Sequence, residues 1–147
     1  MKRKNIFLTT PYEENSDPCK IPFSDYPRPS MKRDSYLCLN GQWDFAVERN
    51  GRASSNKKIL VPFPPESRLS GIGERFKKND VLLYSRTFSL PEGFFKDRVL
   101  IHFGAVDQVA EIFINEKRLG THEGGYLPFS FDITSFLKEG EKRECSV

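Results

Sequence analysis

Cysteines are few in this 147-residue sequence, and long apolar runs are missing. The three cysteines are odd in number and include no C-x-x-C pair, which argues against a disulfide framework and against a zinc knuckle. No run approaches the roughly 18–20 apolar residues that span a bilayer. The apolar stretch at residues 6–8 is also too short for a secretory signal. We therefore expect a soluble, cytoplasmic protein with no membrane partner.

The chain also lacks a large excess of one charge, because its 23 Lys and Arg residues nearly balance its 20 Asp and Glu residues and leave a net charge of only +3. Both signs are scattered along the chain, which is typical of a solvated surface and not of a nucleic-acid interface. His102 and His122 are the only histidines, and neither has a second ligand at metal-binding spacing. A glycine-rich phosphate loop and a G-x-S-x-G nucleophile motif are absent. The sequence predicts no nucleic-acid partner, no metal and no cofactor.

The prolines divide the chain into two parts. Five of the ten lie between residues 9 and 36, too close together for a helix or a central strand to form between them. We predict that residues 1–36 form an extended, Pro-rich arm lying on the protein, and that residues 37–147 form one domain. The 13 Phe, 5 Tyr and 1 Trp residues are enough for a single packed core.

Short alternating runs separated by turn residues predict an antiparallel all-β domain from about residue 37. Trp43 shares the apolar side of the first run with Phe45, and Asn50-Gly51 after it is a hairpin signal. Only residues 66–79 and 134–137 have helical spacing, and the glycines in the first of them weaken it. Seven or eight short strands with so little helix predict a sandwich, a jelly roll or a barrel. The predicted strands are residues 42–48, 58–61, 81–90, 98–105, 109–115, 117–123, 128–133 and 144–147.

Arg86 is unusual because it lies on the apolar side of its predicted strand, with Tyr84 and Phe88. A desolvated guanidinium cannot lose its proton, so it needs a carboxylate or several carbonyls opposite it. Asp132 and Asp107 are the candidate partners. A structural Arg86–Asp132 ion pair that fixes strand order is the favoured interpretation, and a ligand-binding arginine at the sheet rim is the other.

Residues 122–129, HEGGYLPF, predict a loop whose backbone can approach another surface closely, because two adjacent glycines precede an aromatic residue and a proline. The loop either presents Tyr126 to a ligand or is a plain β-turn with a packed tyrosine. For His102, which alternates with apolar neighbours in a strand, an ordinary strand histidine is favoured over a metal ligand.

The order of six segments along the chain is a more specific signal than any one of the segments alone. They resemble, taken together, the amino-terminal sugar-binding domain of glycoside hydrolase family 2, which includes β-galactosidases, β-glucuronidases and β-mannosidases. The resemblance covers residues 37–147. The segments are LNGQWDF at 39–45, VP at 61–62, YSRTF at 84–88, FGAVDQVAEIFIN at 103–115, HEGGYLPF at 122–129 and DIT at 132–134.

This resemblance implies a jelly-roll sandwich of the galactose-binding-domain-like type, packed in the intact enzyme on an immunoglobulin-like sandwich and a (β/α)8 barrel. The glutamate pair that hydrolyses the O-glycosyl bond belongs to the barrel, which needs about 250 residues. We therefore expect no catalytic residue in this chain. Its expected partners are a carbohydrate, either a β-galactoside or a β-glucuronide, and the remaining domains of the parent enzyme.

Two residues are candidates for contact with substrate. The resemblance implies that Asn115 matches a hairpin asparagine that contacts substrate in the galactosidase branch. Glu116 follows it where glycine is usual, and a left-handed conformation there costs about 1 kcal/mol. Tyr126 is the second candidate, as an aromatic platform for a sugar, whereas Trp43 is expected in the core.

Members of the family continue past the strand that matches residues 144–147. We therefore expect a jelly roll that is incomplete at its C-terminal end, a fragment or truncated chain, and homo-oligomers formed by pairing of an exposed edge strand. The alternative to a domain of a glycosidase is a free-standing carbohydrate-binding module or lectin-like protein on the same fold.

Overall fold

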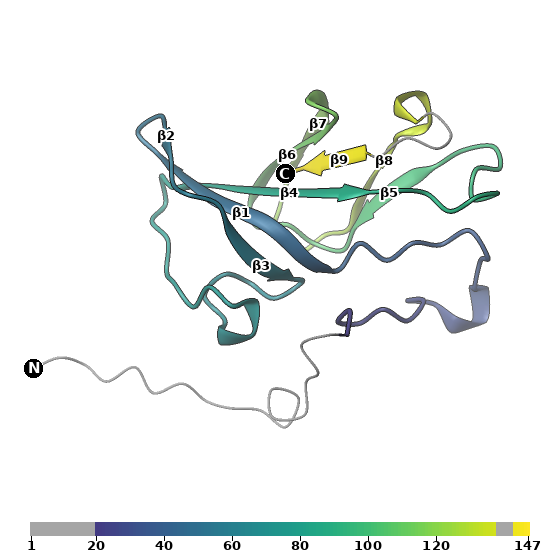
Figure 1. Cartoon of the computed structure of the whole chain (residues 1–147), viewed down its shortest axis with the longest axis horizontal. Helices are drawn as coiled ribbons and strands as arrows, with labels where there is room; N and C mark the ends of the chain where they lie inside the picture. The colour runs from purple at the N-terminus through teal and green to yellow at the C-terminus, as the bar shows by residue number, and fades with distance from the viewer. Residues whose placement is uncertain (1–19, 138–142) are drawn as a thin grey trace, which may run out of the picture.

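The computed structural model describes residues 20–137 and 143–147, and in them the protein is all-β, as the sequence predicts (Figure 1). Three single turns of 3-10 helix accompany the strands: η1 (Pro29–Met31), η2 (Arg68–Ser70) and η3 (Thr134–Phe136). The strands are β1 (Gly41–Arg49), β2 (Arg52–Ala53), β3 (Lys57–Val61), β4 (Val81–Phe88), β5 (Leu100–Phe103), β6 (Val109–Ile114), β7 (Lys117–Glu123), β8 (Phe129–Asp132) and β9 (Arg143–Ser146).

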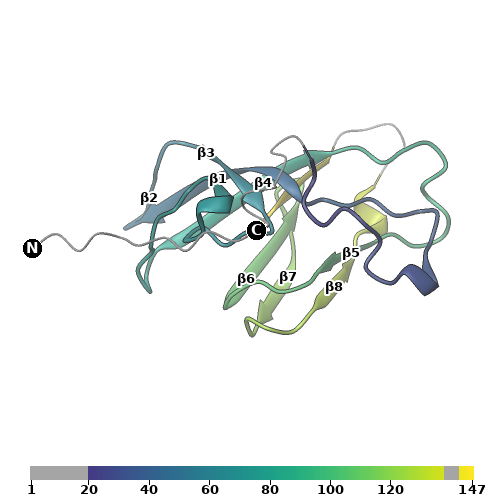
Figure 2. The ribbon, with the colours of Figure 1, turned by 90° about the horizontal axis from the view of Figure 1, so that it is seen from below.

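The strands form two antiparallel sheets. The larger sheet has seven strands in the order β2-β1-β4-β9-β6-β7, with β3 also paired to β1. Within residues 20–137 and 143–147, the smaller sheet contains β5 and β8 alone, which lie beside β6 and β7 in the view from below (Figure 2). Strand β9 pairs with β4 on one side and with β6 on the other, so it joins the two halves of the larger sheet.

The core lies between the sheets because alternate side chains of their strands point inward. In β1, Trp43 and Phe45 are 6% and 1% exposed, which confirms their predicted inward face. The indole nitrogen of Trp43 donates a hydrogen bond of 2.8 Å to the carbonyl of Leu39, which satisfies its one polar group. The smaller sheet contributes Ile101 to the same core, and β9 contributes Cys145.

Two hairpins have two-residue turns in which both residues are left-handed, as the right-handed twist of the strands favours. Asn50 and Gly51 join β1 to β2 with φ angles of 53° and 73°. Asn115 and Glu116 join β6 to β7 with φ angles of 49° and 65°. The hairpin therefore keeps this turn although Glu116 replaces the expected glycine.

Helical structure is almost absent from the described residues. The helical spacing of residues 66–79 produces only the turn η2, which ends at Gly71 with a φ of 82°. The second candidate, residues 134–137, forms the single turn η3. No described helix is long and apolar enough to cross a membrane.

The described part of the arm, residues 20–36, has no strand and only the turn η1, as its prolines predict. It is held against the domain by a 2.9 Å hydrogen bond from the Asn40 amide to the Pro22 carbonyl. The Phe23 ring also lies 6.0 Å from the ring of Phe63. The first part of the predicted arm, residues 1–19, lies outside the described residues.

Arg86 fastens the segment before β1 to the larger sheet. Its Nη1 atom donates hydrogen bonds of 2.8 and 2.7 Å to the carbonyls of Leu39 and Asn40. The predicted pair with Asp132 is wrong, because Asp132 accepts from Arg98 at 2.7 Å. The reason is topological: Arg86 lies in β4 of the larger sheet, whereas Asp132 ends β8 of the smaller one.

Replacing Arg86 tests how much this anchor stabilises the fold. We expect Arg86→Met to lower the free energy of unfolding by about 2–4 kcal/mol, because two hydrogen bonds from a charged donor are lost. The Asn40 carbonyl loses this donor, whereas the Leu39 carbonyl keeps its bond from the Trp43 indole. Urea unfolding followed by fluorescence of Trp43, the only tryptophan, measures the change. The control Arg118→Met removes an exposed pair with Glu111 and should cost less than about 1 kcal/mol. Equal losses in the two variants would contradict the prediction.

The Asp132 carboxylate gives the stability of the fold a dependence on acid pH. Hydrogen bonds from Thr134, and then Arg98, lower the pKa of Asp132 to about 2. A lowered folded-state pKa stabilises the protein above the unfolded value of about 3.9, and this contribution is lost as pH falls toward 2. We expect Asp132→Asn to melt below the unsubstituted chain at pH 6, with the difference in Tm shrinking toward pH 2.5. A difference that stays constant across this range in calorimetry would exclude this role.

Candidate functional site

Two loops meet at one end of the β6–β7 hairpin, and we call them the loop pair: residues 104–108 between β5 and β6, and residues 124–128 between β7 and β8. The amide of Gly124 donates a 2.8 Å hydrogen bond to the carbonyl of Gln108. A Cβ atom on Gly125 would stand 3.0 Å from Cγ and 3.2 Å from Cβ of Asp107. The close approach of the two loops therefore requires glycine at position 125.

Aromatic rings support the loop pair from beneath. The His122 ring stacks on Phe129 with centroids 4.1 Å apart, and Phe129 stacks on Phe103 at 4.9 Å. The Nε2 atom of His122 is buried and has no hydrogen-bond partner among the described residues, so the imidazole serves here as a flat packing surface. His102 instead lies 2.5 Å from the hydroxyl of Ser130 through Nδ1. No group of three potential ligand residues in the described parts of the chain is placed to hold a metal.

The loop pair presents an apolar tip, which we define as Tyr126, Leu127 and Val109. These residues are 96%, 66% and 64% exposed. Val109 is included because it begins β6 opposite Glu123, the last residue of β7, and so lies at the same end of the hairpin. Of the two interpretations of Tyr126, the structure supports a presented side chain and not a packed one.

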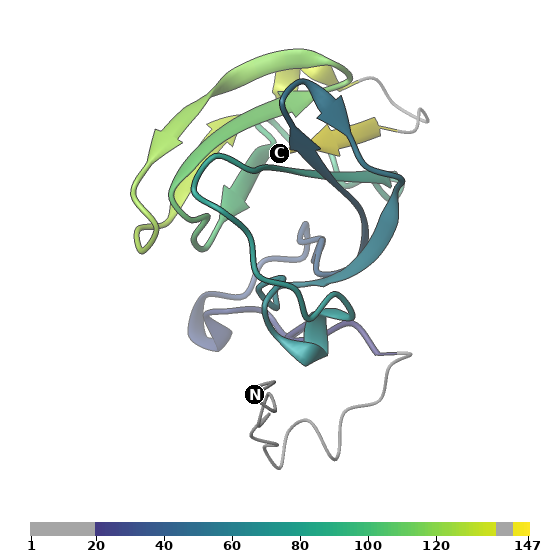
Figure 3. The ribbon, with the colours of Figure 1, turned by 90° about the vertical axis from the view of Figure 1, so that its left-hand side faces the viewer.

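Asn115 lies at the opposite end of the same hairpin. Strand β7, Lys117–Glu123, separates the Asn115 turn from the Tyr126 loop. At about 3.3 Å per residue the two ends are roughly 20 Å apart. The hairpin turn and the β7–β8 loop accordingly lie at different ends of the ribbon (Figure 3). The structure does not bring the two predicted substrate contacts together, so a single monosaccharide cannot touch both.

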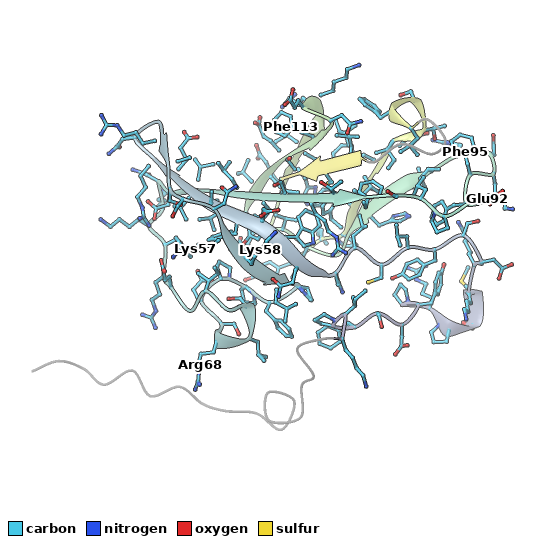
Figure 4. All side chains as sticks on the ribbon, in the orientation of Figure 1. Lys57, Lys58, Arg68, Glu92, Phe95 and Phe113 are labelled. Atoms are coloured by element: carbon cyan, nitrogen blue, oxygen red, sulfur yellow. The ribbon has the colours of Figure 1, made fainter. Side chains whose placement is uncertain are left out.

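Charged side chains at the β1–β3 edge are paired with one another. Lys57 lies 2.5 Å from Glu74, and Lys58 lies 2.8 Å from Asp44. Figure 4 shows both lysines on β3, at the side of the sheet remote from β7. Exposed pairs of this kind stabilise little and mainly balance charge. The positive charges of these two lysines are therefore already neutralised, so this edge is a poor site for an acidic sugar.

Sequence reasoning missed Val109 and Asp107 as parts of this site. A signal for Val109 was present, because Val109 and Glu111 alternate with Ala110 and Ile112, which are 3% and 0% exposed. The outward position of Val109 follows from that period of two. No signal pointed to the contact of Asp107 with Gly125, because it joins two loops that pack only after both sheets form.

The chain is similar in sequence to known proteins. A family model described as glycosyl hydrolases family 2, sugar binding domain, matches residues 71–147, more than half of the chain. A β-glucuronidase of Bacteroides fragilis is 27% identical over 111 residues, which are 76% of this chain and 16% of that protein. A β-galactosidase of Thermoanaerobacter pseudethanolicus is 41% identical over 68 residues, which are 44% of this chain and 9% of that protein.

A solved structure agrees with these matches. The β-glucuronidase of Faecalibacterium prausnitzii superposes on 75% of this chain with a TM-score of 0.61 and 25% sequence identity. The superposed part is 20% of that chain. The present chain thus spans less than a quarter of the length of these three relatives.

A methyl group at position 125 tests the contact within the loop pair. We expect Gly125→Ala to lower the free energy of unfolding by about 1–3 kcal/mol, because Asp107 must move away and the tightly packed loops must separate. Exchange of the Gly124 amide hydrogen, measured by NMR, should become faster at the same time. The control Gly104→Ala has open space around its new Cβ and should change stability by less than about 0.5 kcal/mol. Unchanged exchange in Gly125→Ala would show that the loops are not in contact.

Proposed function

The chain belongs to glycosyl hydrolases family 2 through that family's sugar binding domain, and we propose that it is one part of a longer enzyme that hydrolyses β-glucuronides or β-galactosides. The match over residues 71–147 is the observation that carries this proposal. The similar proteins named above are β-glucuronidases and a β-galactosidase, and each is several times longer than the part that matches.

In this proposal the chemistry belongs to the rest of the enzyme, and this domain supports it. A retaining glycosidase needs a carboxylic acid with a raised pKa to protonate the leaving group. The described carboxylates whose pKa is clearly shifted have lowered pKa values, not raised ones. Arg49 and the Lys77 amide lower the pKa of Asp80 to about 2, and Thr134 with Arg98 does the same for Asp132. Carboxylates held ionised in this way act as structural anchors and not as general acids.

We place the sugar contact of this domain at the Asn115 end of the β6–β7 hairpin. The turn residues Asn115 and Glu116 carry an amide and a carboxylate, which are groups that form hydrogen bonds with sugar hydroxyls. Their left-handed backbone is fixed by the hairpin, so the groups have a defined direction. The Tyr126 loop lies at the other end of the hairpin, beyond strand β7.

Hydrolysis of nitrophenyl glycosides tests this function. The longer polypeptide should hydrolyse nitrophenyl β-glucuronide or β-galactoside, whereas residues 1–147 alone should show no turnover. Within the longer enzyme, Asn115→Ala should raise KM about 2–10-fold, the effect of one lost hydrogen bond of about 0.5–1.5 kcal/mol.

Asn50→Ala is the matched control for this experiment. Asn50 occupies the same left-handed position in the β1–β2 turn, so the substitution strains the backbone equally without touching the proposed contact. Its KM should equal that of the unsubstituted enzyme. Turnover by residues 1–147 alone would refute the assignment of catalysis to other domains, and equal KM values for the two variants would refute the contact of Asn115.

A further inference from the structure

We propose that Asn50 is a site of spontaneous chemical modification, at which the exposed Asn50–Gly51 turn loses ammonia and becomes a mixture of aspartate and isoaspartate. The same dipeptide occurs a second time, at Asn40–Gly41, and the fold protects that copy. The reaction consumes only water. The inference does not depend on the proposed function, because β2 and the β6–β7 hairpin lie at opposite ends of the strand order.

The nucleophile in this reaction is the backbone itself. The amide nitrogen of the residue after asparagine loses its proton and attacks the side-chain carbon Cγ, a new N–C bond forms, and the side-chain nitrogen leaves as ammonia. Water then opens the five-membered imide at either carbonyl, which gives aspartate or isoaspartate and one new negative charge. Glycine in the second position favours the attack, because it has no side chain to hinder the approach of its nitrogen.

The Asn50–Gly51 turn is open to water. Both of its residues are exposed. No heavy atom of the described residues lies within 4 Å of the position that a Cβ atom on Gly51 would take, so nothing packs against this side of the turn. In Figure 1 the hairpin of β1 and β2 projects from one end of the larger sheet. Water and base therefore reach the Gly51 nitrogen freely.

The turn can also open without unfolding of the domain. Strand β2 has only two residues, both are exposed, and they pair with the last two residues of β1. Behind them the hairpin is closed by Ser54, whose amide donates a 2.8 Å hydrogen bond to the Val47 carbonyl and whose hydroxyl accepts one of 3.0 Å from the Val47 amide. Loss of the two β2 pairs thus gives the Gly51 nitrogen the freedom to reach Cγ of Asn50 while Val47 stays in place.

The second copy of the dipeptide is held in place. The side-chain nitrogen of Asn40, which would be the leaving group, donates a 2.9 Å hydrogen bond to the Pro22 carbonyl. The backbone carbonyl of Asn40 accepts one of 2.7 Å from Arg86. Gly41 is buried, and a Cβ atom on it would stand 3.2 Å from Nη1 of Arg86. Attack at Asn40 therefore requires the arm and the Arg86 anchor to separate first.

The two products affect the hairpin differently. Aspartate preserves it, because Asp-Gly suits a left-handed two-residue turn as well as Asn-Gly does. Isoaspartate routes the chain through Cβ and adds one backbone atom to the turn, so the pairing of β2 is lost. Either product lowers the net charge of +3 by one. An aged sample is thus a mixture of more acidic forms in which the core is intact.

Peptide mapping by mass spectrometry during incubation at pH 8 tests the proposal, and electron-transfer fragmentation distinguishes isoaspartate from aspartate. In the folded chain, Asn50 should convert at least about 10-fold faster than Asn40, because only the turn opens without wider unfolding. In concentrated urea both sites should convert at similar rates, since both are Asn-Gly. Equal rates in the folded chain would overturn the proposal. A difference that persists unchanged in urea would overturn the protection of Asn40 by the fold.

Two variants change the two sites separately. Ser54→Ala removes the hydroxyl that closes the β1–β2 hairpin, so it should speed conversion at Asn50 and leave the rate at Asn40 unchanged. Arg86→Met removes the hydrogen bond to the Asn40 carbonyl and should have the opposite pattern. Faster conversion at both sites in Ser54→Ala would show that Asn50 reacts through global unfolding, against the local opening proposed for the turn.

Discussion

Hydrogen bonds on both sides of β9 hold the larger sheet together. Cys145 lies opposite Arg86 of β4 and opposite Ile114 of β6, and its side chain is fully buried. The backbone of Val147 exchanges two further hydrogen bonds of 2.8 Å with Tyr84. Without this short strand, β1–β4 and the β6–β7 hairpin would share no ladder. The positions of the Asn115 turn and of the apolar tip relative to the rest of the domain therefore depend on it.

Alternation within each strand made most of the fold predictable, because a half-buried strand must place apolar residues at every second position. The inward face of Trp43 and the unusual place of Arg86 both followed from it. The partner of Arg86 did not, because a local pattern cannot tell which sheet a strand joins. Asp132 has the right charge, but it lies in the smaller sheet beside Arg98, while two carbonyls before β1 satisfy the guanidinium. A desolvated cation can be satisfied by a carboxylate or by carbonyl oxygens, and the topology of the fold decides which of the two it meets.

The candidate site was predictable only in part. A glycine pair before an aromatic residue indicated a loop at residues 122–129 but left open whether Tyr126 is presented or packed, and the resemblance to family 2 pointed to Asn115. Asn115 and Tyr126 lie at the two ends of the same hairpin, separated by the seven residues of β7. The contact of Asp107 with Gly125 depends on the packing of two loops, which no local period records. The β6–β7 hairpin thus carries the Asn115 turn at one end and the exposed Tyr126 loop at the other.

The central place of β9 also has a consequence for synthesis on the ribosome. Ser85 of β4 pairs with Ser146, which is translated long after it, so the edge of β4 stays open while the intervening strands are made. Such distant pairings are slow to form, and open strand edges invite pairing with other chains. The nascent domain is therefore especially exposed to misassociation just before β9 emerges. The pace of translation through this region, or a chaperone bound there, would influence how much protein reaches the native fold.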